Sequence, residues 1–147
     1  MHANAAKFRV DTRRIFLIGQ SAGGHMVSLA ATLGDGPWPR TGGWEEADNS
    51  VAGVISVAAA YDLPSLDWGD IWSPLETFAY SGPGEPHAVV RQPAPDPAEA
   101  RQLASPSRHV TAGMPPLLIL HSSTDHSVPI ANVTTQRDPL LTPFDPS

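Results

Sequence analysis

The sequence has 147 residues, the size of one ordinary domain, and its hydrophobic share of 41% excludes a disordered chain. A formal net charge of −6 without any basic stripe argues against a nucleic acid partner, and the absence of Cys excludes disulfides and thiolate chemistry. No apolar run approaches the roughly 20 residues of a membrane-spanning helix, and the N-terminal stretch lacks the apolar core of a signal peptide, so we expect a cytoplasmic protein without a membrane partner.

The first third of the chain predicts a helix end, a buried strand and a second helix. Residues 2–9 are rich in Ala, the best helix former, and are typical of the last turns of a helix. The apolar run Ile15–Ile18 suits a strand that is buried on both faces of a parallel sheet. Residues 22–33 then carry apolar side chains at helical spacing, and Gly34 is well placed to end that helix.

The rest of the chain predicts two more buried strands separated by long connections. The two strands are expected at residues 51–60 and 117–120. Residues 35–50 are typical of a loop, and residues 62–98 are typical of an irregular, Pro-rich connection with one helix near residues 71–80. Short helices are expected at Pro97–Leu103 and after Ile130. Strands joined by helical or long connections indicate an α/β fold, here with three neighbouring parallel strands flanked by helices.

The residues that join the first strand to its helix match the pattern G-x-S-x-G of a nucleophile elbow. The motif is Gly19-Gln20-Ser21-Ala22-Gly23, and its position between a buried strand and a helix gives it weight. The tight turn is expected to strain the backbone of Ser21. We also expect Gly19 and Gly23 to be required, because a Cβ at either position would collide with the backbone on the other side of the turn. The N–H of Ala22 would then point to the place where an oxyanion forms.

Two other interpretations of this segment carry less weight. A Gly-rich turn of a nucleotide-binding domain would show G-x-G-x-x-G, which is absent. His25 lies four residues after Ser21 on the same helix, and we expect it to pack between helix and sheet rather than to act as a base.

The run RIFLIGQSAGGHMVSLAATLG resembles the elbow region of α/β-hydrolase carboxylesterases of the feruloyl-esterase-like (BD-FAE) and hormone-sensitive-lipase-like kind. These families have G-x-S-A-G-[GA]-H at this point, which residues 19–25 match. The resemblance implies that the three strands correspond to family strands five to seven, that Ser21 is the nucleophile and that Ala22 contributes to the oxyanion hole. It implies a small-molecule ester as substrate and no cofactor or metal.

A second segment resembles the family around its catalytic acid. Residues 115–129 read PPLLILHSSTDHSVP, similar to the family pattern P-P-x-L-I-x-H-G-x-x-D-x-x-V-P, so the resemblance makes Asp125 the acid that orients the catalytic His. Ser122 stands where the family has Gly. Taken alone, Asp125 would suit an Asx-turn in a polar loop.

The remaining parts of the family's site have no match in the sequence. No H-G-G oxyanion motif precedes Gly19, and no His follows His126, although the family's base lies well beyond its acid. A base is required because a Ser hydroxyl is hardly ionised near neutral pH. His126 is a weak candidate for this base. It is adjacent to Asp125, and the side chains of adjacent loop residues point in different directions, so we do not expect His126 to reach between Asp125 and Ser21.

We therefore expect a partial esterase domain over residues 1–131 and an unassigned tail over residues 132–147. Three functions stay open: a serine carboxylesterase, a catalytically inactive remnant and a small-molecule binding module. Trp68, Trp72, Phe78 and Tyr80 either line an acyl pocket or form a satellite core. Apolar strands at the edges of so short a sheet could also lead to self-association.

Overall fold

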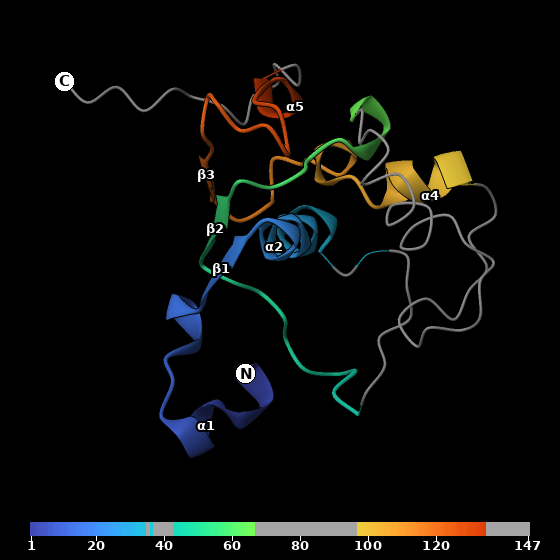
Figure 1. Ribbon diagram of the computed structural model, residues 1–147. Helices are drawn as coiled ribbons and strands as arrows, with labels where there is room; N and C mark the ends of the chain where they lie inside the picture. Colours follow the sequence, from blue (N-terminus) through green and yellow to red (C-terminus); the bar gives the residue numbers. More distant parts are fainter. Residues whose placement is uncertain (35, 37–42, 67–96, 135–147) are drawn as a thin grey trace.

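Three short parallel strands form the centre of the molecule. The computed structural model describes residues 1–34, 36, 43–66 and 97–134. Its strands are β1 (Phe16–Gln20), β2 (Gly53–Val57) and β3 (Leu117–Leu120), arranged in the order β1-β2-β3 with both pairs parallel (Figure 1). The predicted α/β fold with three neighbouring parallel strands is confirmed, although β2 is shorter than the apolar run that predicted it.

Helix α2 (Ala22–Leu33) follows β1 directly and has the predicted bounds. Gly34 ends it with a φ of 60°, a left-handed value that glycine adopts without a steric cost. The stripe that α2 buries is small and polar rather than apolar, and it consists of Gly24, His25, Ser28, Ala31 and Thr32. Met26, by contrast, keeps 69% of its surface exposed. Small side chains in this stripe let the helix backbone approach the sheet closely.

The other elements are short. The N-terminal segment contains a 3-10 turn at His2–Asn4 followed by α1 (Ala5–Phe8), and further 3-10 turns occur at Thr12–Arg14, Leu63–Ser65 and Pro106–Arg108. Helices α4 (Pro97–Leu103) and α5 (Ala131–Thr134) agree with the predicted short helices. The helix expected near residues 71–80 and the aromatic cluster there lie outside the described residues.

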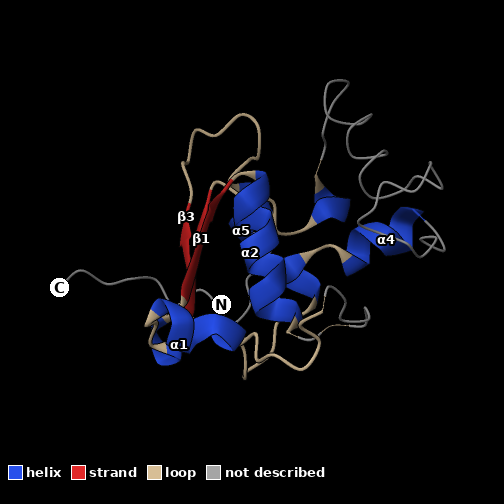
Figure 2. Cartoon of the chain, turned by 90° about the horizontal axis from the view of Figure 1, so that it is seen from below, coloured by secondary structure: helices blue, strands red, loops and turns tan. Residues whose placement is uncertain are grey.

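Both helices that pack on the sheet lie on the same side of it. Figure 2 shows α2 and α5 beside one face of the strands. The core on this side includes a cluster of Ala59, Tyr61 and Val133 with Ile119 and Ile130, and a second cluster of Ala60, Leu63, Ala104 and Val128. In the described part of the chain, no helix is long and apolar enough to cross a membrane.

Candidate active site

Ser21 sits at the tip of the turn between β1 and α2. Its backbone has φ 53° and ψ −122°, a conformation that L-residues with a side chain rarely adopt. Two hydrogen bonds hold this turn: the N–H of Ser21 donates to the carbonyl of Val57 at 2.8 Å, and the N–H of His25 donates to the carbonyl of Ser21 at 2.9 Å. The expected strain at Ser21 is therefore present, and the residue is exposed at the carboxyl end of β1.

The glycines of the turn do not share one role. A Cβ on Gly19 would lie 2.2 Å from the carbonyl oxygen of Gly23, so no side chain fits at position 19. A Cβ on Gly23 would meet nothing within 4 Å, so the expectation that it would collide there is wrong. The second tight position is Gly24, where a Cβ would lie 2.9 Å from the Cβ of Ala59. The backbone of Gly23 is the obstacle for Gly19, while its own Cα–H bond points into open space.

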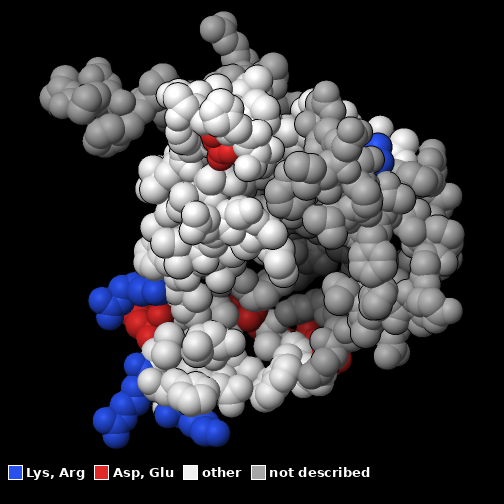
Figure 3. Space-filling view, viewed as in Figure 1, with Lys and Arg blue, Asp and Glu red and all other residues white. Residues whose placement is uncertain are grey.

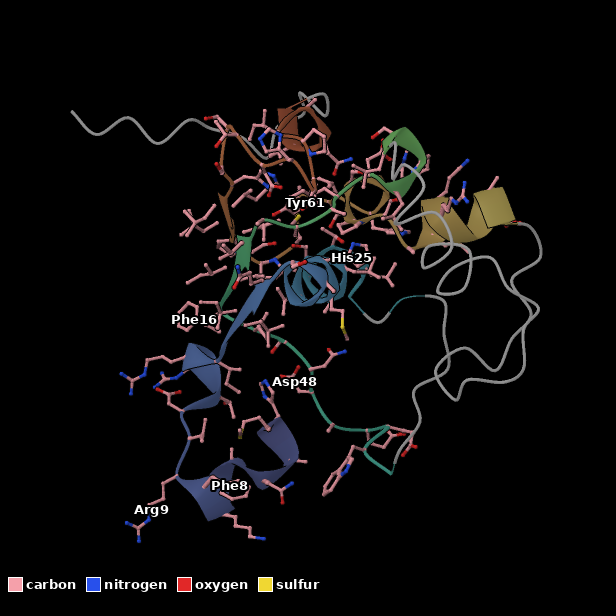
Figure 4. The ribbon with its side chains drawn as sticks, viewed as in Figure 1. Phe8, Arg9, Phe16, His25, Asp48 and Tyr61 are labelled. Carbon is pink, nitrogen blue, oxygen red and sulfur yellow. The ribbon has the colours of Figure 1, made fainter. Side chains whose placement is uncertain are left out.

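His25 is buried beneath the turn, as the sequence suggested. Only 5% of its surface is exposed, and its Nδ1–H donates to the carbonyl of Ala60 at 2.8 Å (Figure 4). Burial lowers the pKa of His25 because desolvation disfavours the imidazolium, an effect that the hydrogen bond to Ala60 partly opposes. His25 thus ties α2 to the segment after β2.

Buried hydroxyl groups make a second link between α2 and β2. Both Ser28 Oγ and Ser56 Oγ donate to the carbonyl of Gly24, at 2.8 and 3.0 Å. Tyr61 Oη donates to Ser56 Oγ at 2.8 Å, and burial raises the pKa of this phenol. These bonds fix the first turn of α2, and with it the position of Ser21, against the middle strand.

Asp125 lies in the loop after β3, and that loop's own backbone fixes one of its carboxylate oxygens. Oδ1 accepts hydrogen bonds from the N–H groups of Ser127 (2.8 Å) and Val128 (3.0 Å). The N–H groups of Val128 and then Ser127 hold the pKa of this carboxyl below its usual value, with smaller contributions from His121 and His126. Asp125 is therefore ionised near neutral pH and held in one orientation.

His121 supports the Asp125 loop in a way that the sequence did not reveal. Its side chain is almost fully buried, its Nε2–H donates to the carbonyl of Val128 at 2.7 Å, and Nε2 lies 3.6 Å from Asp125 Oδ2. The imidazole thus closes the loop whose N–H groups bind Asp125. The sequence signals for His121 were its place at the end of an apolar run and its match to the His of the family pattern, neither of which predicts this contact.

No described residue joins Ser21 to Asp125. His126 is exposed, and among the described residues no hydrogen bond links it to either of them. His2 and His109 hydrogen-bond to the carbonyls of Ser50 and Leu103 respectively, and His87 is outside the described residues. The base for the candidate nucleophile therefore stays unidentified.

Ser21 and Asp125 nevertheless belong to the same edge of the sheet. All three strands run parallel, Ser21 follows the last residue of β1, and Asp125 lies five residues beyond the last residue of β3. Between them, Ala58 follows β2 with a left-handed φ of 50°, and its N–H donates to the carbonyl of Leu120. Within the described ranges, no group of three or more metal-ligating side chains gathers here or elsewhere.

Comparison with known protein families shows that the chain resembles esterases. A model of the family BD-FAE matches residues 1–139. Two proteins of Mycobacterium tuberculosis, the probable carboxylic ester hydrolase LipM and the esterase LipC, are each 33% identical to the chain over 128 residues. That alignment covers 87% of this chain but 28% of LipM and 30% of LipC. The chain thus spans less than a third of these relatives' length.

Comparison with solved structures supports the fold. A truncated form of a carbohydrate esterase from gut microbiota superposes with a TM-score of 0.68 at 23% identity. Esterase 2 of Thermogutta terrifontis, phosphonylated by cyclosarin, superposes with a TM-score of 0.59 at 20% identity. Each comparison covers 92% of this chain, but 49% and 41% of the two solved chains.

Proposed function

Since the chain belongs to the BD-FAE family and has part of the α/β-hydrolase fold, we propose that it carries the nucleophile and acid of a serine carboxylesterase acting on small-molecule esters. The observation that carries the proposal is the strained, exposed Ser21 at the tip of a strand-to-helix turn. In this role Ser21 Oγ attacks the acyl carbon of the ester. The N–H of Ala22, at the start of α2, donates to the developing oxyanion.

The arrangement of Asp125 supports this assignment. With Oδ1 taken by two loop N–H groups, Oδ2 is the oxygen left to accept the Nδ1–H of a catalytic imidazole. Ser21 and Asp125 leave strands that lie two spacings apart, about 10 Å. An imidazole with its two hydrogen bonds spans about 8 Å, so one ring is the group that fits between them. His126 is the weak candidate for that base within this chain.

Several further assignments stay predictions. They are the division into a domain over residues 1–131 and a tail over 132–147, a cytoplasmic location, the absence of nucleic acid and membrane partners, and self-association through the edges of the sheet. The physical basis for edge pairing is that β1 and β3 are the outer strands of the described sheet and carry no charged residue.

Covalent labelling tests the assignment of Ser21. A fluorophosphonate reagent forms a bond between phosphorus and a Ser oxygen, with loss of fluoride and of the hydroxyl proton. With imidazole added to act as the base, we expect intact-mass spectrometry to show one adduct on the chain and none on the Ser21→Ala variant. Ser123→Ala removes another exposed hydroxyl from the same edge of the sheet and should keep the adduct. An adduct that persists in Ser21→Ala would contradict the proposal, and an unlabelled wild-type chain would favour an inactive remnant.

A further inference from the structure

The loop that carries Asp125 is closed at its base by a buried imidazole. His121 directly follows the last residue of β3, and its side chain keeps only 2% of its surface exposed. Its Nε2–H donates to the carbonyl of Val128 at 2.7 Å. The side chain of Val128 belongs to the core cluster that contains Leu63. The loop is therefore anchored at one end by the strand and at the other end by the core.

Val128 couples His121 to Asp125. Its carbonyl accepts from His121, and its N–H donates to Asp125 Oδ1 at 3.0 Å. Both groups belong to one residue, so a movement that follows the loss of one bond also disturbs the other. A second N–H, from Ser127, binds the same carboxylate oxygen at 2.8 Å. The orientation of the Asp125 carboxylate thus depends on where Val128 is held.

His121 also lies beside the second oxygen of the carboxylate. Its Nε2 is 3.6 Å from Asp125 Oδ2, the oxygen that is left to accept from a catalytic imidazole. Among the described residues, those that lower the pKa of Asp125 all belong to its own loop, and none is a Lys or an Arg. Figure 3 shows the main group of Lys and Arg side chains at the N-terminal segment, far from the carboxyl ends of the strands. The loop alone therefore supplies the polar groups that hold this acid.

Packing does not explain an imidazole at this position. Donation to the carbonyl of Val128 requires the proton on Nε2, which makes Nδ1 of His121 an acceptor. In the described structure Nδ1 is buried and has no hydrogen-bond partner. An unpaired buried acceptor is destabilising, and Leu or Phe would fill this space without one. What the imidazole adds is the Nε2–H that reaches Val128.

We propose that His121 is a positioning residue of the site: its Nε2–H holds the carbonyl of Val128, the N–H of Val128 then holds Asp125 Oδ1, and Oδ2 is kept available for the Nδ1–H of a catalytic imidazole. His121 acts through Asp125 and contacts no reacting atom. The inference rests on the role proposed for Asp125, but its first step, the hold on the carboxylate, is measurable without any ester.

Variants of the whole chain separate the donor from the bulk of the ring. In His121→Gln the amide nitrogen takes the position of Nε2 and keeps the bond to Val128. In His121→Asn the shorter amide takes the position of Nδ1 and leaves that carbonyl without a donor. His121→Phe keeps the volume of the ring and also lacks the donor, so it is the second loss variant if His121→Asn does not fold. The control is Ser122→Ala, which removes an exposed hydroxyl that binds Thr124 in the same loop.

The first measurement is the titration of the Asp125 carboxyl carbon by nuclear magnetic resonance, with circular dichroism as the check of the fold. We expect the pKa of Asp125 to rise toward the ordinary value of an Asp in His121→Asn, and to stay at its wild-type value in His121→Gln and in Ser122→Ala. A merely structural His121 would lower the stability of His121→Asn without moving this pKa. That result would overturn the inference, and so would an equal rise in His121→Gln.

The second measurement is the Ser21-dependent hydrolysis of p-nitrophenyl acetate over a range of added imidazole concentrations. We expect His121→Asn to lose most of the gain in rate that imidazole gives to the wild-type chain, and His121→Gln to keep it. An unchanged imidazole dependence in a folded His121→Asn chain would overturn the inference. A wild-type chain without any Ser21-dependent gain would contradict the proposed function instead, and the titration of Asp125 would still show whether His121 holds the carboxylate.

Discussion

The turn that presents Ser21 depends on one glycine more than on the other. In Gly19→Ala the new methyl group would meet the carbonyl oxygen of Gly23 at 2.2 Å and the N–H nitrogen of Gly24 at 2.7 Å, and backbone atoms cannot move aside as a flexible side chain could. We expect a loss of about 3 kcal/mol in the free energy of unfolding. Gly23→Ala adds a methyl group in open space within a helix, so its effect should lie between neutral and a gain of about 1 kcal/mol. Urea unfolding of the two variants measures the difference, and equal losses would contradict it.

Burial of His25 makes stability depend on pH. Its pKa is lowered in the folded state, so below about pH 6.5 the unfolded chain binds more protons than the folded one. The free energy of unfolding should therefore fall as the pH drops from 7 to 5. His25→Gln cannot be protonated and should flatten this part of the profile, measured by urea unfolding at each pH. A profile with the same slope in wild type and variant would assign the dependence to other groups.

At the scale of single residues, the sequence predicted the strained backbone at Ser21 but not the contacts of the side chains around it. The motif around Ser21 fixes a strained turn because only such a turn joins a buried strand to a helix in so few residues. The role of Gly23 was predicted wrongly, since spacing does not tell where a Cα–H bond points. The contact between His121 and the Asp125 loop was missed because it depends on how the chain folds back at Val128. A sequence pattern does not describe such a fold-back.

Among the elements, α5 is held by the hydrogen bonds of the buried Asn132 side chain in addition to the packing of Val133. Asn132 Oδ1 accepts from the N–H groups of Tyr61 (2.8 Å) and Asp62 (3.3 Å), and Nδ2 donates to the carbonyl of Asp62 and to Ser65 Oγ. Asp62 in turn binds Arg108 at 3.2 Å. The segment after β2 is thus joined to the 3-10 turn at Pro106–Arg108 and to α5.

Removing this amide should separate α5 from the core. Asn132→Ala leaves buried N–H groups without their acceptor, and we expect a loss of about 2–4 kcal/mol in the free energy of unfolding. Thr124→Ala, in the exposed part of the Asp125 loop, is a suitable control and should change stability by less than about 0.5 kcal/mol. Urea unfolding measures both, and an Asn132→Ala chain as stable as the control would contradict this role.

The existence of the elements followed from periodicity, whereas their packing did not. Apolar runs predicted β1 and β3 because both faces of a parallel strand are normally buried, yet in the described structure Ile18 and Leu118 are exposed on one face. Apolar spacing predicted α2 correctly, but the face that it buries is the one with His25 and Ser28. Small and polar side chains suit a helix that lies close to the sheet and bonds to it, which hydrophobicity alone does not predict.

At the scale of the whole molecule, the sheet determines which parts of a hydrolase site are brought together. Parallel strands place Ser21 and Asp125 at one edge of the sheet, with β2 lying between their strands. Neither residue reaches the other, and the hydroxyl of Ser21 stays protonated without a base. We therefore expect the chain alone to hydrolyse p-nitrophenyl acetate only slightly faster than its Ser21→Ala variant.

Added imidazole should act as the general base that Ser21 lacks. At about pH 8 free imidazole is neutral, and Asp125, with its lowered pKa, is ionised and able to orient the ring through Oδ2. We expect the Ser21-dependent rate to rise about tenfold, below the 10²- to 10⁴-fold of a fixed general base, because a free base must first be bound. Ser21→Ala at the same imidazole concentration corrects for direct attack of imidazole on the ester, and Asp125→Asn should lose most of the gain.

The result of the imidazole experiment tests the role of Ser21 and the role of Asp125 separately. Equal rates for the wild-type chain and Ser21→Ala at every imidazole concentration would contradict the role of Ser21 as a nucleophile. A gain that survives in Asp125→Asn would leave Ser21 as the nucleophile but remove Asp125 as the acid. A large Ser21-dependent rate without imidazole would mean that the chain contains its own base, and His126→Gln would then show whether His126 supplies it. The expected pattern is a low rate that imidazole raises only when both residues are present, and it follows from the proposed roles of Ser21 and Asp125 at one edge of the sheet.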